Sequence, residues 1–204
     1  MLLADSRGTD IYVALREAYP DANIRVAYAP GCPPTFTPTV GDRKFFAECS
    51  EFNQARLQEA IAAPAEDIVF LAANLSKWRQ EAMLDTVSRI RATGKTVFIL
   101  GEFRITGYKN PIDIAIGELR HGDERYLERF IVEKPFELDG AYAEKVTALG
   151  AVYVSNKPLF YDGQYHFEDR KTGQLLTEDG KHLSTYGATK FGQYLRANYP
   201  LPQS

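Results

Sequence analysis

Short apolar runs of strand length alternate along the chain with longer stretches whose apolar residues recur at helical spacing. Most of the short runs are rich in Val, Ile, Leu or Phe, which is typical of strands buried on both faces. We expect five such strands, at Met1–Ala4, Ile24–Ala29, Asp67–Ala73, Thr96–Leu100 and Ala151–Ser155. The alternation predicts an α/β fold, a three-layer α/β/α sandwich around a central, mostly parallel five-stranded sheet.

The longer stretches predict helices at Asp10–Ala18, Phe45–Ala62, Leu75–Ala92, Pro111–Glu118 and Ala141–Leu149. A glycine follows two of them, a common signal for the end of a helix. Ser184 is expected to cap a final helix that runs to about Asn198. The aromatic segment 161–167 indicates a small hairpin, and the pattern over 123–137 gives no clear element.

Length and charge narrow the function classes. With 204 residues, 1–204 is expected to form a single domain. The hydrophobic fraction of 45% and the net charge of −3 are those of a globular protein without the basic surface that nucleic acid requires. The first residues, Met1–Leu3, have neither the basic nor the long apolar region of a signal peptide. We therefore expect either a cytoplasmic protein or a domain excised from a longer membrane-anchored parent.

Two cysteines, Cys32 and Cys49, bear on this choice. The turn-forming residues between them allow a disulfide, which would close a loop worth roughly 3 kcal/mol. Two separate buried thiols remain the alternative. A bridge would place the protein in a periplasmic or other extracytoplasmic compartment, because disulfides persist where conditions are oxidising.

Three polar or small residues follow the first three predicted strands: Ser6, Gly31 and Asn74. Ligands of open parallel sheets bind beyond the carboxyl ends of the strands, so these residues are expected to share one edge. Near the other end of the chain, Asp179 and His182 are spaced to meet within one turn. A serine attacks an acyl carbon when a histidine takes its proton and a carboxylate orients that histidine. Each residue alone also fits a helix cap, a turn or an exposed surface position.

The full set resembles a known family through these motifs: Asp5-Ser6, Gly31, Asn74 and Asp179-x-x-His182. They are similar to the SGNH branch of the GDSL hydrolases, which implies a flavodoxin-like sheet. The similarity is strongest to SGNH domains fused to membrane-bound sugar O-acyltransferases, through the segments Ala29–Pro34, Leu71–Trp78 and His182–Ala188. It spans nearly the whole chain.

The resemblance implies a role for each matching residue. Ser6 would be the nucleophile, His182 the general base and Asp179 the group that orients the imidazole. The backbone N–H groups of Ser6 and Gly31 and the side-chain amide of Asn74 would form the oxyanion hole. Neither a cofactor nor a metal is expected.

Three positions depart from the family pattern: Ala4 in place of glycine, Arg7 after the serine in place of histidine, and Leu75 in place of aspartate. Arg7 is a candidate contact for an anionic or strongly hydrogen-bonding sugar. Trp78 is a second candidate substrate contact, as a surface for sugar stacking.

The resemblance implies O-acetylation of a bacterial surface polysaccharide through an acyl-Ser6 intermediate. The partners would be a carbohydrate or acyl-donor substrate and a membrane-bound acyltransferase domain in the parent protein. Two alternatives remain, a freestanding carbohydrate or lipid acetylesterase and a non-catalytic carbohydrate-binding domain. A metal site at His166 and its neighbouring carboxylates is weaker, because the segment lacks a recognised ligand spacing.

Overall fold

The computed structural model describes residues 1–37, 46–64, 67–75, 77–106, 111–122, 127–132 and 136–201. Contacts divide the chain into two compact units, which we describe one at a time. The first unit contains Met1–Thr9, Asn23–Glu102 and Leu138–Val154. The second contains Asp10–Ala22, Phe103–Glu137 and Ser155–Ser204.

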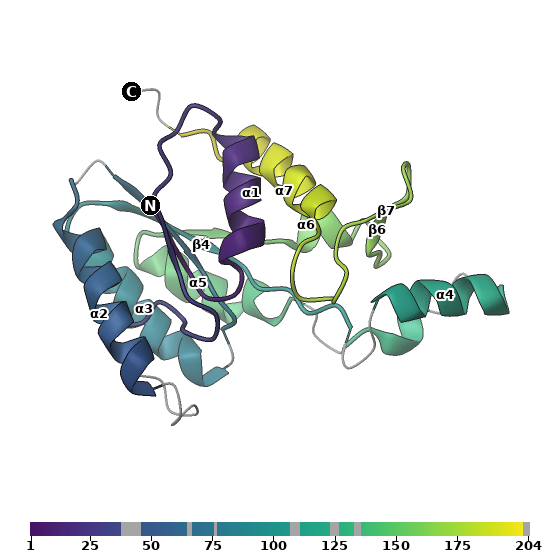
Figure 1. Cartoon of the computed structure of the whole chain (residues 1–204), viewed down its shortest axis with the longest axis horizontal. Coiled ribbons are helices and arrows are strands. Elements are labelled where there is room, and N and C mark those ends of the chain that lie inside the picture. Colours follow the sequence, from purple (N-terminus) through teal and green to yellow (C-terminus); the bar gives the residue numbers. More distant parts are fainter. Residues whose placement is uncertain are drawn as a thin grey trace. The chain divides into compact units, whose positions relative to one another are not determined.

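The first unit holds a five-stranded parallel sheet with the order β2-β1-β3-β4-β5. Figure 1 shows the strands of this sheet side by side. Its strands are β1 (Leu2–Ala4), β2 (Val26–Tyr28), β3 (Ile68–Ala72), β4 (Thr96–Leu100) and β5 (Val152–Val154). This arrangement confirms the predicted fold class and all five strands. Ala4 pairs with both Tyr28 and Ala72, so the first three strands end level with one another. The loops that carry Ser6, Gly31 and Asn74 therefore leave the same edge of the sheet.

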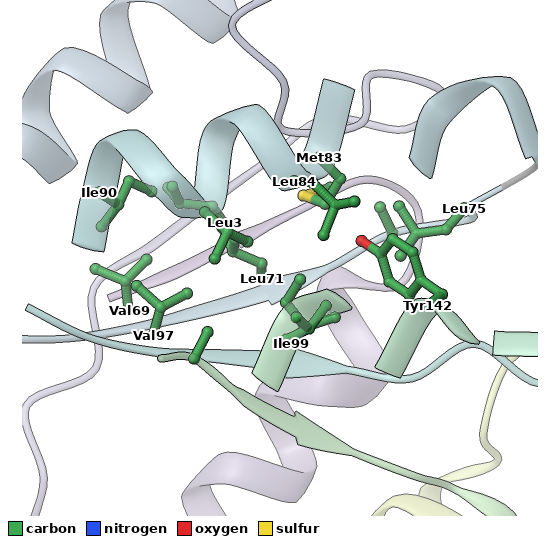
Figure 2. Close-up of a cluster of buried hydrophobic side chains, with 14 of the residues drawn as sticks. Leu3, Val69, Leu71, Leu75, Met83, Leu84, Ile90, Val97, Ile99 and Tyr142 are labelled. Atoms are coloured by element: carbon green, nitrogen blue, oxygen red, sulfur yellow. The ribbon is translucent and has the colours of Figure 1, made fainter. Parts of the chain in front are cut away.

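One face of this sheet packs against helices α2 (Phe46–Ala62), α3 (Lys77–Arg91) and α5 (Ala141–Ala148). Leu3, Leu71 and Ile99 are neighbours on three adjacent strands, and all three are buried in this layer (Figure 2). The helices contribute apolar side chains such as Ile90 and Val146. Burying one aliphatic side chain of this size stabilises a fold by roughly 1.5–3 kcal/mol. This layer is therefore a rigid support for the loops at the edge of the sheet.

The second unit is mostly helical. It contains most of α1 (Gly8–Ala18), with α4 (Pro111–His121), α6 (Lys157–Phe160), α7 (Thr185–Asn198) and the 3-10 turn η1 (Leu127–Phe130). A second 3-10 turn, η2 (Glu137–Asp139), lies where the chain passes from the second unit into the first. Within the second unit α7 packs closely on α1, since a side chain at Gly192 would meet the carbonyl of Ala14. Ser184 caps α7 as predicted, with its hydroxyl accepting the Gly187 N–H at 3.0 Å.

The expected small hairpin over 161–167 is present only as one isolated antiparallel bridge between Tyr161 and Tyr165. The bridge encloses a turn in which Gly163 adopts a φ of 114°. The paired strands are β6 (Glu168–Asp169) and β7 (Gln174–Leu175), just after that segment. In the part of the chain that the structure describes, the helices are too short or too polar to cross a membrane.

Candidate active site

Ser6 lies in the turn between β1 and α1, and Asp5 organises that turn. The Asp5 carboxylate is 2% exposed. One of its oxygens accepts the Arg7 N–H at 3.1 Å and the other accepts the Asn74 N–H at 2.7 Å. A buried carboxylate is stabilised when it accepts several N–H groups. Asp5 thus joins the Ser6 turn to the Asn74 loop, across two adjacent strands.

The Asn74 loop is bound by a second carboxylate. Leu75 donates its N–H to Glu102, which follows β4. Two consecutive amides after β3 therefore bind carboxylates from the strands on either side. This fixes the backbone at Asn74, whose side chain is exposed at the edge of the sheet.

The Gly31 loop is shaped by its backbone and by α2. Gly31 has a φ of 77°, in the left-handed region that favours glycine. The next residue, Cys32, forms a disulfide bond with Cys49 of α2, with a Cα–Cα separation of 5.4 Å. Asn53, also on α2, donates to the carbonyls of Pro33 at 2.8 Å and Thr35 at 3.2 Å.

Arg56 joins this loop to the sheet. Its guanidinium is buried and donates to the carbonyls of Ala4, Ala27 and Cys32 at 2.8, 3.1 and 2.6 Å. Burial lowers the pKa of Arg56 to about 10, and the negative charge of Asp5 acts in the opposite direction. Sequence reasoning missed Arg56 and Asn53. A signal was present, because Asn53 lies four residues before Leu57 and Arg56 lies four residues before Ala60, on the buried face of α2.

Arg7, the expected substrate contact, lies in the turn after β1. Its side chain is 2% exposed and donates to the carbonyl of Gly101 at 2.7 Å. This bond joins the ends of β1 and β4, and a contact of Arg7 with substrate stays a prediction. Trp78 lies in α3, but its side chain falls outside what the structure describes.

In the second unit, Asp179 and His182 form a hydrogen-bonded pair. Asp179 Oδ2 lies 2.6 Å from His182 Nδ1, and Oδ1 accepts the N–H groups of Lys181 and His182 at 2.8 and 2.7 Å. Burial raises the pKa of Asp179, but the bonds from His182 and Lys181 outweigh it and the pKa is lowered. An ionised Asp179 requires the proton on Nδ1, so Nε2 of the neutral ring is the proton acceptor.

The turn that carries this pair is anchored on both sides. Thr177 donates its hydroxyl to the His182 carbonyl at 2.6 Å and accepts the Gly180 N–H at 2.9 Å. Leu183 donates its N–H to the buried carboxylate of Asp10 at 2.9 Å. Thr177 and Asp10 are further positioning residues that sequence reasoning missed.

The predicted site residues thus fall into two sets. Ser6, Gly31 and Asn74 share one edge of the sheet in the first unit, and Asp179 and His182 form a pair in the second. His166, the weaker metal candidate, lies 3.1 Å from the Leu159 carbonyl through Nε2. Among the described residues, no three His, Cys, Asp or Glu side chains gather as a metal site would require.

Comparison with known proteins agrees with this architecture. The periplasmic domain of a lipopolysaccharide acetyltransferase from Salmonella ser. Paratyphi A has a similar fold, with a TM-score of 0.75. It is 14% identical in sequence, and the similarity covers 95% of this chain and 81% of that one. No curated protein sequence matched the chain. A family model described as the SGNH domain fused to AT3 domains matches residues 1–197, and the chain therefore belongs to this SGNH family.

Proposed function

We propose that this domain transfers an acyl group, acetyl in the simplest case, through a covalent ester on Ser6. The observation that carries the proposal is the bond between Asp179 and His182 Nδ1, at 2.6 Å. In the proposed reaction, His182 Nε2 takes the Ser6 hydroxyl proton as Oγ attacks the acyl carbon. The donor alcohol leaves with that proton. An acceptor hydroxyl then attacks the ester and gives its proton to His182, which passes that proton to Ser6 Oγ as Ser6 leaves.

The oxyanion of each tetrahedral intermediate would bind the N–H groups of Ser6 and Gly31 and the side-chain amide of Asn74. Preorganised donors of this kind are worth roughly 3–4 kcal/mol each. Support comes from the common sheet edge and from the contacts of Asp5, Glu102 and α2 with these loops.

We further propose that the acceptor is a polysaccharide hydroxyl and that 1–204 acts as one domain of a membrane-anchored parent, outside the cytoplasm. The family is described as fused to AT3 domains, and the similar Salmonella domain is periplasmic and comes from a lipopolysaccharide acetyltransferase. The Cys32–Cys49 disulfide supports an oxidising compartment. A membrane-bound acyltransferase domain would supply the acyl group.

The first test is covalent labelling. Wild-type protein is incubated with a fluorophosphonate probe and, separately, with a chromogenic acetate ester, and the labelled peptide is identified by mass spectrometry. We expect label on Ser6, ester turnover, and loss of both in Ser6→Ala. Ser88→Ala is the matched control, since Ser88 is an exposed serine of the same unit, on α3.

The outcome separates the function classes. Wild-type protein that neither labels nor turns over the ester would contradict an enzyme and favour a carbohydrate-binding domain. If the protein turns over the ester, adding an oligosaccharide distinguishes a transferase from an esterase. An acetylated sugar indicates a transferase, and release of acetate alone indicates an esterase.

A further inference from the structure

We infer that Arg56 and Asn53 of α2 are positioning residues for the oxyanion hole, fixing the loop in which Gly31 offers its N–H group. This inference rests on the proposed function. Neither side chain is assigned to touch substrate, so both would act through the backbone that they bind.

The hydrogen bonds of Arg56 place it between the Gly31 loop and the strand that leads into the Ser6 turn. Nη1 donates to Ala4, the last residue of β1 and two positions before Ser6, and to Ala27 of β2. Nη2 donates to Cys32, the residue after Gly31. One planar group thus sets the spacing between the Ser6 turn and the Gly31 loop.

Asn53 fixes the orientation of that planar group. Its Oδ1 accepts from Nε and Nη2 of Arg56 at 2.9 and 2.5 Å. Its Nδ2 donates to Pro33 and Thr35, further along the same loop. All the acceptors in the loop are carbonyl oxygens, so these bonds orient its peptide planes without using an N–H group. An oxyanion hole requires that arrangement, because its N–H groups must bind the developing charge.

Arginine suits this position better than any other residue. A guanidinium offers five donors in a fixed plane, whereas the lysine ammonium is a compact charge on a flexible stem. Burying a cation among neutral carbonyls is costly compared with an apolar side chain in the same place. An apolar residue would complete the core face of α2 but would remove the side-chain bonds to all three carbonyls. The presence of arginine therefore indicates that the carbonyls at this edge of the sheet have to be held in a fixed arrangement.

The experiment compares Arg56→Lys, Arg56→Met and Asn53→Ala with wild type, using turnover of the chromogenic acetate ester. We expect kcat to fall about 10- to 100-fold in Arg56→Met, with KM within about twofold, because displaced oxyanion donors weaken transition-state binding alone. Arg56→Lys should retain more activity than Arg56→Met, and Asn53→Ala should lose about 10-fold. Hydrogen exchange over residues 29–37 should become faster in each.

Arg91→Met is the matched control. Arg91 is also a helix arginine that donates to a backbone carbonyl, that of Lys95, but it lies just before the amino end of β4. We expect it to lower the melting temperature without changing kcat by more than about twofold, which separates a loss of stability from a loss of positioning.

The outcomes separate this inference from the proposed function. Wild-type protein without ester turnover overturns the proposed function, and the inference with it. Active wild type with kcat within twofold in both folded Arg56→Met and Asn53→Ala overturns the inference alone. A rise in KM at constant kcat also overturns it, because that pattern indicates lost ground-state binding. If Arg56→Met fails to fold, Asn53→Ala and Arg56→Lys decide the question.

Discussion

The two parts of the candidate site are constructed in different ways. At the sheet edge, each loop is held by residues distant in sequence, as Asp5 binds Asn74 and Arg56 binds Ala4. The Asp179–His182 pair is local, since both residues lie in one turn and bond directly. Asp5 and Arg56, which hold the loops at the sheet edge, are each 2% exposed, whereas the side chains of Asp179 and His182 are 48% and 38% exposed.

The difference follows from what each part would do. Oxyanion donors must be in place before charge develops, so their backbone is held by many contacts and by a disulfide. A general base must accept and release a proton in each cycle, and an accessible imidazole with one fixed nitrogen suits that exchange. We therefore expect each single substitution at the sheet edge to lower kcat only in part, and substitution of His182 to remove nearly all activity.

The largest expected effect is that of His182→Ala. Without the base, the Ser6 hydroxyl is a poor nucleophile, so kcat/KM for ester hydrolysis should fall about 10,000-fold or more. If both parts serve one reaction, Ser6→Ala and the double variant should be no slower than His182→Ala within about threefold. Multiplicative losses in the double variant would instead mean that Ser6 and His182 act independently. His121→Ala, at the exposed end of α4, is the control and should retain wild-type activity.

A smaller effect is expected at the sheet edge. Asn74→Ala removes one side-chain donor and should lower kcat about 100- to 1,000-fold while KM changes little. Steady-state kinetics with the acetate ester measures both constants. Asn198→Ala, on the exposed end of α7, is the matched control. A rise in KM without loss of kcat would assign Asn74 to substrate binding and remove it from the oxyanion hole.

The same contrast explains how much could be predicted from sequence. Asp179 and His182 are three residues apart, so their spacing by itself indicates the pair. The five strands could be predicted from sequence as well, because each lies in a short apolar run. Arg56 was not predicted, since its acceptors are backbone carbonyls 24, 29 and 52 positions away. The bond from Arg7 to Gly101 was not predicted for the same reason, because only the fold brings these two residues together.

The contribution of the disulfide to the sheet edge can be measured as a change in the free energy of unfolding. Replacing both Cys32 and Cys49 with serine should lower the free energy of unfolding by about 3 kcal/mol, because the unfolded chain regains the freedom of a loop of that length. Urea titration measures this, and wild type in reductant should match the double variant. A double variant as stable as oxidised wild type would show that the loop depends on Arg56 and Asn53 alone. Reductant should leave the double variant unchanged, which controls for other effects of the reagent.

The smallest expected effect concerns the pH dependence of Asp179. Bonds from His182 and Lys181 lower its pKa from the ordinary 3.8, against the effect of burial. The ionised form therefore stabilises the fold above the ordinary value, and this stabilisation is lost as pH falls through the lower, folded value. The melting-temperature difference between wild type and Asp179→Asn should therefore shrink as pH falls below about 4. Its size should be modest, because exposed pairs are screened by solvent.

Glu178→Gln is the control for this measurement, since Glu178 is the exposed carboxylate beside Asp179. It removes a negative charge from the neighbouring position without touching the bonds between Asp179 and His182. A difference for Asp179→Asn that widens as pH falls below about 5 would mean that the carboxyl pKa is raised in the folded protein. Burial would then outweigh the bonds from His182 and Lys181, and these bonds would not be what keeps Asp179 ionised as the partner of the imidazole.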